Sequence, residues 1–158
     1  MNFAVAFDLL IGHEGVYSDN PHDPGGETKY GISKRSYPAV DIKSLTLADA
    51  KALYFRDFWT RAQCDKLPPI LAFAVFDAAV NSGIGQAIRW LQRAVGVADD
   101  GVIGPLTLAA IQRQNDDSAI CARFNGQRLD FMTRLSTWEV FSRGWARRIA
   151  ANLQTIGN

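Results

Sequence analysis

The fold of this chain is decided by residues 12–32, which read GHEGVYSDNPHDPGGETKYGI. Just before them, apolar side chains recur at helical spacing over residues 3–11, so we expect a helix over about 3–14. The quoted stretch is dense in Gly, Pro, Asn and Asp, which is typical of turns, and it leaves room for a short hairpin near Glu27–Ile32. The sequence therefore predicts a helix that ends at a glycine and carries Glu14 towards a turn-rich loop.

Beyond this stretch, the chain indicates a series of helices separated by start and stop signals. Thr46 followed by Asp49 resembles a capping box, which opens a helix expected over residues 47–61. Residues 70–81 follow two prolines and are apolar on nearly every face, which indicates a central buried helix. Later helices are expected over residues 86–95, from Pro105, over 118–135 and over 139–155. The pattern predicts a mainly α fold with one small β-hairpin.

A modest boundary between two lobes lies near residues 84–96. It divides an N-terminal lobe, residues 1–90, from an Arg-rich helical lobe, residues 91–158. Lobes of this size are too small to guarantee independent folding, so we expect the two to share one core. No internal repeat is visible in the sequence.

The composition is that of an ordinary globular protein, with 47% hydrophobic residues and a net charge of only +1. The charge is unevenly placed, because residues 84–158 carry nine arginines against six acidic residues. This excess indicates either a solvated helical surface or an Arg-rich face that meets an anionic polymer, since guanidinium groups pair with carboxylates in a forked geometry. No basic stripe follows a single helix, so nucleic acid is not an expected partner.

The two cysteines, Cys64 and Cys121, have neither CxxC spacing nor clustered histidines beside them, so no metal site is expected. Two free thiols in a reducing cytoplasm are the default interpretation, and a disulfide between them stays open. No stretch reaches the roughly 18 apolar residues of a membrane span. The first ten residues lack a basic segment and contain Asp8, so we do not expect a signal peptide. We expect synthesis in the cytoplasm and, for a substrate outside the membrane, delivery by another system.

Glu14 carries the main chemical inference from the residues alone. It is the next position on the apolar stripe of the first helix, where partial burial would raise the pKa of its carboxyl group. The partial negative charge at the helix C-terminus acts in the same direction. A carboxylic acid that stays protonated near neutral pH can protonate the leaving oxygen in glycoside cleavage. The alternative is an ordinary helix-end glutamate that reaches solvent.

Asp23 and Thr28 would complete a catalytic site around Glu14. Glycoside hydrolysis commonly uses two carboxylates on opposite sides of the scissile bond. Asp23 would be the base or an electrostatic stabiliser, and the Thr28 hydroxyl would position water. Asp23 is equally well explained as a turn residue, because HDPGG is a good turn by itself. Asp19 and Glu27 are rival candidates for the second carboxylate.

Several blocks of the sequence resemble a known family of enzymes. The runs GHEGVY at 12–17 and DPGGETKYGI at 23–32 resemble the motif block of glycoside hydrolase family 108, N-acetylmuramidases found as phage endolysins and in related bacterial proteins. The run FDAAVNSG at 76–83 is similar to a second block of that family. Residues 91–107 resemble the start of the peptidoglycan-binding module that usually follows, and GWARR at 144–148 fits that module as well.

The resemblance implies a lysozyme-like helical fold with a small β-hairpin beside the active-site cleft. It assigns a catalytic lobe to residues 1–90 and a peptidoglycan-binding lobe to residues 91–158. It also implies that Glu14 is the catalytic acid in the family's Glu-Gly-Gly-Tyr motif, from which Val16 departs. The departure bears on the loop conformation, because the acid and the tyrosine of the motif are both retained.

The order Glu14, Asp23, Thr28 also resembles the Glu-Asp-Thr arrangement of phage-type lysozymes, with the threonine one residue earlier. This likeness supports catalytic roles for all three residues. The implied enzyme hydrolyses the β-1,4 bond between N-acetylmuramic acid and N-acetylglucosamine. It needs neither a metal nor another cofactor, because two carboxylates and water suffice. We expect a monomer whose partner is the peptidoglycan glycan strand.

Substrate contacts are expected from aromatic and amide side chains near the loop. Tyr17 and Tyr30 supply both a ring for stacking on a sugar and a hydroxyl for hydrogen bonding. Trp59 either stacks in the same way or belongs to the core. Asp77 and Asn81 share one helix face, where they satisfy loop backbone groups or, as the resemblance implies for Asn81, face the cleft. The remaining tryptophans are expected to pack within the second lobe: Trp90, Trp138 and Trp145.

Two alternative functions use the same motifs. A lytic transglycosylase cleaves the same bond without water and uses one acid/base glutamate, so Asp23 and Thr28 argue against it. A non-catalytic wall-binding module would show a lost acid or a filled cleft, so the retained Glu14 and its intact loop argue against that interpretation.

Overall fold

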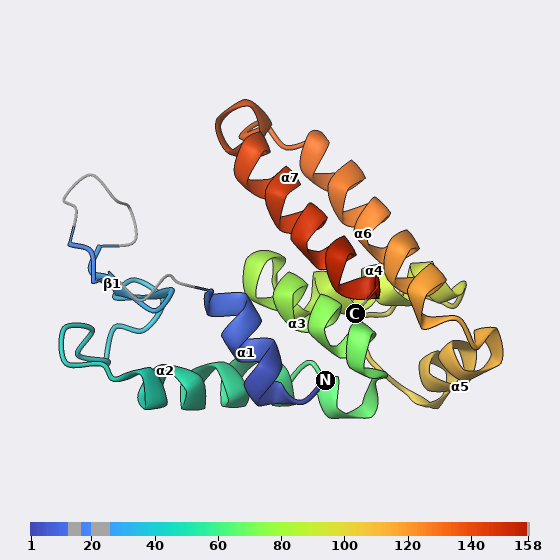
Figure 1. Cartoon of the computed structure of the whole chain (residues 1–158), viewed down its shortest axis with the longest axis horizontal. Coiled ribbons are helices and arrows are strands. Elements are labelled where there is room, and N and C mark those ends of the chain that lie inside the picture. Colours follow the sequence, from blue (N-terminus) through green and yellow to red (C-terminus); the bar gives the residue numbers. More distant parts are fainter. Residues whose placement is uncertain (13–16, 20–25, 158) are drawn as a thin grey trace. The chain divides into compact units, whose positions relative to one another are not determined.

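The computed structural model describes residues 1–12, 17–19 and 26–157 (Figure 1). The chain forms two compact units, one of residues 2–57 and one of residues 58–158 together with Met1. The described elements are helices apart from one two-stranded sheet, so the expected mainly α fold is confirmed. No helix in these described ranges combines the length and apolar character that a membrane crossing needs.

Helix α1, Phe3–Ile11, opens the smaller unit. The side chain of Asn2 caps it by accepting a hydrogen bond from the Val5 backbone N–H at 3.1 Å. The helix ends three residues before the predicted end at residue 14. The cause is Gly12, whose φ of 55° and ψ of −134° leave helical geometry while its N–H donates to the Asp8 carbonyl at 3.0 Å. The apolar stripe therefore stops at Ile11.

A β-hairpin follows, built from β1, Thr28–Lys29, and β2, Ile32–Ser33. The strands are antiparallel, with Thr28 opposite Ser33 and Lys29 opposite Ile32. The two loop residues between them, Tyr30 and Gly31, both have positive φ, 51° and 74°, as a type I′ turn requires. The hairpin predicted near residues 27–32 is thus confirmed.

Helix α2, Leu47–Tyr54, begins at the predicted capping box. Thr46 Oγ1 accepts from the Asp49 backbone N–H at 3.1 Å, and Asp49 Oδ2 accepts from the Thr46 backbone N–H at 3.1 Å. The helix continues into a π-helical turn, η1, Phe55–Thr60, so the range predicted as one helix is helical with a widened last part. Within this unit the ring of Tyr54 packs edge-on against Phe7 at 5.6 Å between centroids.

The larger unit is an assembly of helices around α3, Pro69–Ser82. Residues 71–79 of α3 are all buried, which confirms the predicted central helix. Helix α3 packs against α4, Ile84–Val95, and α6, Asp117–Thr133, and α6 packs along α7, Trp138–Gln154 (Figure 1). The remaining elements are the 3-10 turns η2, Cys64–Lys66, and η3, Thr155–Gly157, and helix α5, Pro105–Gln114.

The tryptophans of this unit differ in burial. Trp59 is 1% exposed, and its Nε1 donates to Asp65 Oδ1 at 2.7 Å. Of the two roles considered for Trp59, the structure shows the core role. Trp90 is also 1% exposed and packs edge-on against Phe124. The two tryptophans of α7 are only half-buried, unlike Trp90.

Both cysteines are buried free thiols, so the alternative of a disulfide between them is not realised. Burial raises the pKa of Cys64 to about 12 and that of Cys121 to about 11. Thiols with such values stay protonated at neutral pH and are poor nucleophiles. They act here as small core residues.

A buried ion pair with several partners joins three helices of the larger unit. Asp77 of α3 accepts from Arg128 Nη2 on α6 at 2.8 Å and from Arg148 Nε on α7 at 2.8 Å. The amide of Asn152 donates to the same carboxylate at 3.1 Å. Arg128 is fully buried, and this burial lowers its pKa while the Asp77 carboxylate raises it. The network ties the central helix to the C-terminal helix pair.

Candidate active site

The predicted site residues fall into three groups in the structure. Tyr17, Thr28 and Tyr30 lie in the smaller unit, on and beside the hairpin. Asn81 lies in the larger unit, near the end of α3. The two proposed catalytic carboxylates, Glu14 and Asp23, lie outside the described residues.

Tyr17 is held by one of the rival carboxylates. Its hydroxyl donates to Glu27 Oε1 at 2.7 Å. This hydrogen bond, with desolvation and the Glu27 charge adding to it, raises the pKa of Tyr17 to about 12. The hydroxyl therefore stays protonated at physiological pH and keeps its donor role. Glu27 has a structural partner, which sequence reasoning did not anticipate.

Thr28 is fixed through both its backbone and its side chain. Its backbone forms an antiparallel bridge with Ser18, with N–H to O distances of 2.8 and 2.9 Å. Its hydroxyl donates to the Gly26 carbonyl at 3.1 Å. Since a hydroxyl has one proton and two lone pairs, Oγ1 keeps acceptor capacity after this bond. A half-buried acceptor of this kind can receive a hydrogen bond from a water molecule.

These contacts tie together two short segments that flank residues 20–25 in the sequence. The Ser18–Thr28 bridge is a backbone contact, and the Tyr17–Glu27 bond joins the side chains of the residues that precede these two in the sequence. Residues 17 and 18 are thereby held against residues 27 and 28. Asp23 lies in sequence between the two tied segments, and Asp19 at the edge of this interval is exposed.

Tyr30 occupies the first loop position of the hairpin, in left-handed backbone geometry. Its carbonyl accepts from the Tyr54 hydroxyl at 3.2 Å, which anchors the turn to α2. The ammonium group of Lys29 lies 5.6 Å from the centroid of its ring. The ring is half-buried, so part of its surface is available to a ligand.

Asp77 and Asn81 share a face of α3 but have different surroundings. Asn81 is exposed, and its Oδ1 accepts from the neighbouring Ser82 hydroxyl at 3.3 Å. Asp77 is 3% exposed and pairs with Arg128 and Arg148, so the idea that it satisfies loop backbone is wrong. The one sequence signal for this pairing was a lone acid on an apolar helix combined with an excess of arginine in the second half.

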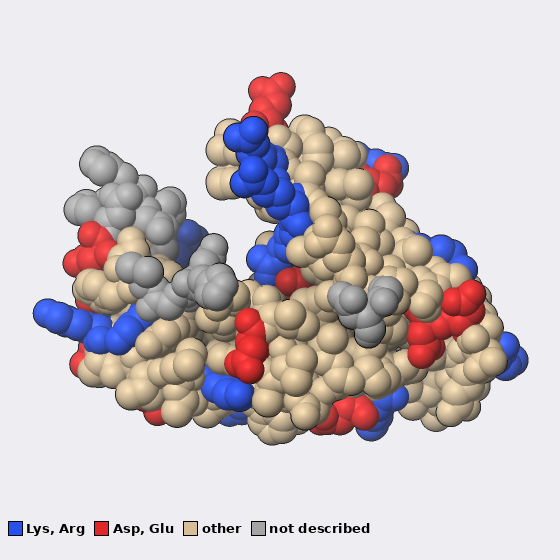
Figure 2. Space-filling view, viewed as in Figure 1, with Lys and Arg blue, Asp and Glu red and all other residues tan. Residues whose placement is uncertain are grey.

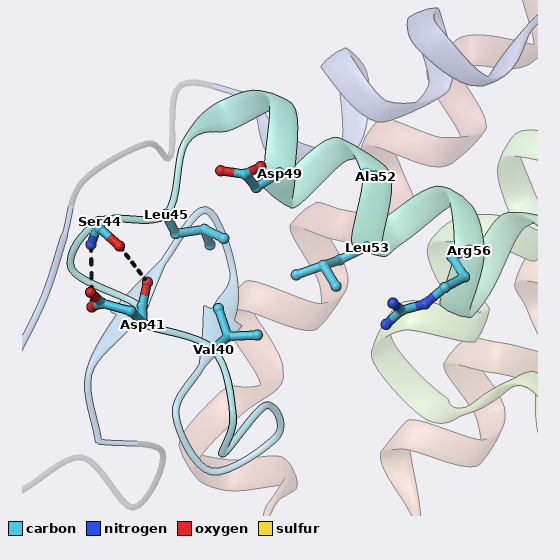
Figure 3. A pocket seen from close by; sticks show the side chains of 8 residues that line it. All are labelled: Val40, Asp41, Ser44, Leu45, Asp49, Ala52, Leu53 and Arg56. Atoms are coloured by element: carbon cyan, nitrogen blue, oxygen red, sulfur yellow. Dashed lines mark hydrogen bonds between the residues drawn. The ribbon is translucent and has the colours of Figure 1, made fainter.

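A pocket of about 590 Å³ lies elsewhere in the smaller unit (Figure 3). Its two acids are occupied locally, since Asp41 accepts hydrogen bonds from Ser44 and Asp49 accepts from Thr46. These hydrogen bonds lower the pKa of both carboxyl groups. None of the predicted site residues that the structure describes lines this pocket. Its walls are formed by Val40, Asp41, Ser44, Leu45, Asp49, Ala52, Leu53 and Arg56.

No group of three or more His, Cys, Asp or Glu side chains within the described ranges is arranged to hold a metal ion. The polar side chains beside the hairpin include Tyr17, Thr28 and Glu27, and the Tyr17 hydroxyl donates to the Glu27 carboxylate. The described part of the site can therefore position a substrate and water through hydrogen bonds.

Two family models match the sequence, and together they cover most of it. The model described as glycosyl hydrolase 108 matches residues 7–83. The model described as a predicted peptidoglycan domain matches residues 86–150. No curated protein matches the chain.

A solved structure of SagA from Brucella abortus is similar to this chain over nearly its whole length. The two sequences are 34% identical, and the alignment covers 98% of this chain and 92% of the SagA chain. The TM-score of 0.85 shows that the backbone follows the same path. The expected helical fold with a small hairpin is therefore shared with a solved structure.

Proposed function

Since this chain belongs to the glycosyl hydrolase 108 family, we propose that it is an N-acetylmuramidase that hydrolyses the β-1,4 bond between N-acetylmuramic acid and N-acetylglucosamine. Membership makes the protein a lysozyme-like glycoside hydrolase, and the second family match makes peptidoglycan its polymer. The resemblance of the motif blocks at 12–32 and 76–83 is thus confirmed as to family, enzyme class and polymer. The bond cleaved and the residues that cleave it are the proposal.

The observation that carries the proposal is the pair of contacts between the residues that flank 20–25 in the family-matched segment. The backbone bridge at Thr28 and the hydrogen bond from Tyr17 to Glu27 fix the two ends of the interval that contains Asp23. Catalytic groups need to be held within about 0.5 Å of their productive geometry, and side chains on a loop reach this only when the loop is anchored. The hairpin supplies such an anchor.

In the proposed reaction, Glu14 is the general acid. It gives its proton to the glycosidic oxygen as the bond from that oxygen to the anomeric carbon breaks. Asp23 takes a proton from a water molecule, whose oxygen forms the new bond to the anomeric carbon. Thr28 holds this water through the acceptor capacity that its Oγ1 keeps after donating to Gly26. A base that acts through water inverts the anomeric carbon.

Substrate contacts are proposed for three further side chains. The half-buried ring of Tyr30 stacks on the apolar face of a sugar. The half-buried ring of Tyr17 has the same role. The exposed amide of Asn81 forms hydrogen bonds with the N-acetyl groups of the glycan. We propose that the protein works as a monomer on the glycan strands of the cell wall.

The experiment is digestion of purified peptidoglycan by the wild type and by Glu14→Gln, with mass spectrometry of the products. The wild type is expected to release fragments with reducing N-acetylmuramic acid ends. Glu14→Gln is expected to lose at least about 100-fold in rate, because its amide cannot donate the proton that the leaving oxygen needs. The matched control is Asp8→Asn, which removes an exposed carboxylate from α1 and is expected to keep the wild-type rate.

Other outcomes would replace the proposal. Anhydro ends would make the protein a lytic transglycosylase, and full activity of Glu14→Gln would remove that residue from catalysis. Firm binding to peptidoglycan by both proteins, without cleavage by either, would identify a wall-binding module that is not an enzyme.

A further inference from the structure

Helix α7 buries one side and leaves the other side exposed. Ile149 and Asn152 are buried, and Trp138 and Trp145 are half-buried, at spacings that place all four on one helix face. A second side, which we call the outer face of α7, runs from the two arginines round to Phe141 at the border with the buried side and includes five exposed residues that matter here. They are Val140, Phe141, Arg143, Gly144 and Arg147.

One edge of the outer face is aromatic. Phe141 is 52% exposed, and its ring centroid lies 5.7 Å from that of Trp145 at an interplanar angle of 33°. The ring of Trp145 lies in turn 6.1 Å from that of Trp138. Trp145 thus contacts both other rings, and the Phe141 ring packs on it while half of Phe141 stays exposed. An exposed, braced ring is suited to stacking on the apolar face of a sugar.

The other edge of the outer face is basic. Arg143 and Arg147 are exposed and one helical turn apart, and neither forms an ion pair with any described residue. Arg134 and Arg148, by contrast, are each paired with an aspartate. The single acid of α7 is Glu139, in its first turn. Figure 2 shows a strip of basic side chains along α7 with an acidic side chain at one end, so this edge carries a net positive charge.

The helix surface between the Phe141 edge and the arginine edge carries only small side chains near Gly144. At 100° per residue, Val140 and Gly144 lie between the Phe141 edge and the arginine edge. Gly144 has no side chain, and no heavy atom lies within 4 Å of the position that its Cβ would take. A chain-like ligand can therefore approach the helix backbone at Gly144 with a ring on one side and two guanidinium groups on the other.

Peptidoglycan has the chemistry that this face would recognise. Its sugars present apolar faces, and the peptides attached to them carry carboxylates, which pair with guanidinium groups. The family match to a peptidoglycan domain extends over residues 86–150 and so includes the whole outer face. We propose that the outer face of α7 holds a peptidoglycan strand, with Phe141 against a sugar and with Arg143 and Arg147 on peptide carboxylates. The proposal rests on peptidoglycan as the polymer and is independent of Glu14 and of the bond cleaved.

The test is co-sedimentation of the full chain with insoluble peptidoglycan, measured in the Glu14→Gln background at several salt concentrations. The double variant Arg143→Gln/Arg147→Gln is expected to bind on the order of tenfold more weakly at low salt, as two exposed ion pairs would give. Its affinity is also expected to depend less on salt, because the screened contacts are gone. Phe141→Ala is expected to bind several-fold more weakly at every salt concentration, because stacking is not screened.

The matched control is Arg89→Gln/Arg113→Gln, which removes the same charge from exposed positions on α4 and α5 and is expected to bind as the parent does. All five substituted positions are exposed, and unchanged circular dichroism would show that each variant is folded. Equal loss in the control and the test variants would overturn the proposal in favour of bulk charge. Parent-like binding by both α7 variants would also overturn it, as would tighter binding of the parent to vesicles of anionic lipid than to peptidoglycan.

Discussion

At the scale of single residues, the hairpin depends on a glycine that no other residue can replace without strain. Gly31 has a φ of 74°, which a residue with a side chain rarely adopts. A Cβ at this position would also lie 2.5 Å from the Tyr54 hydroxyl oxygen. That hydroxyl donates to the Tyr30 carbonyl, so it cannot move away without breaking the contact that anchors the turn. The strand carrying Thr28 is positioned by this turn.

We therefore expect Gly31→Ala to lower the free energy of unfolding by about 1–3 kcal/mol, through backbone strain and the clash with Tyr54. Gly126→Ala is the opposite control. Gly126 lies inside α6, with no heavy atom within 4 Å of a built Cβ, so alanine should stabilise the helix by about 0.5–1 kcal/mol. Urea unfolding followed by circular dichroism measures both. Equal effects of the two substitutions would contradict this account of the turn.

At the scale of elements, helix ends are set by local chemistry that can be inspected one cap at a time. Helix α2 begins at a reciprocal cap between Thr46 and Asp49, whereas the N-cap residue of α7, Thr137, makes no side-chain cap bond. Helix α1 ends with Gly12 as its C-cap and does not reach Glu14, because the backbone of Gly12 has a positive φ that leaves helical geometry. The pattern of apolar residues located the helices, and the caps decided where they stop.

Thr46→Ala is expected to lower the free energy of unfolding by about 1 kcal/mol, and Thr137→Ala by much less. The difference should depend on pH, since the Thr46 hydrogen bonds lower the pKa of Asp49 below 3.8. Stabilisation from a lowered pKa is present above 3.8 and is lost as the pH falls through the folded-state value. Unfolding titrations at neutral pH and near pH 2 measure this. A cost for Thr46→Ala that is the same at both pH values would exclude the role of ionised Asp49.

At the scale of the whole molecule, the boundaries of the family matches and of the compact units differ. The family matches meet between residues 83 and 86, at the junction of α3 and α4. The compact units meet at residues 57 and 58, so α3 belongs to the same unit as the peptidoglycan domain. The Asp77 network explains this physically, because it joins α3 to α6 and α7 through buried charges.

Asp77→Asn is expected to lower the free energy of unfolding by about 3–5 kcal/mol, because it leaves the fully buried Arg128 without a counter-charge. Asp130→Asn is the matched control on α6, where the pair with Arg134 is exposed and is expected to contribute less than about 1 kcal/mol. Thermal and urea unfolding of both variants would decide. A similar loss of stability in the two variants would show that burial of the Asp77 network does not account for its contribution to the free energy of unfolding.

The family, the series of helices and the hairpin could all be predicted from the sequence, because they depend on patterns and turn residues that are local in the chain. It also identified Thr28, Tyr17 and Tyr30 as neighbours, since the loop and hairpin are short. It did not reveal that Glu27 bonds to Tyr17, that Asp77 pairs with Arg128 and Arg148, or that α7 carries an exposed face. These contacts came from the folded structure, because the partner of a side chain 10, 51 or 71 residues away depends on how the elements pack, and the local pattern marks at most the lone acid.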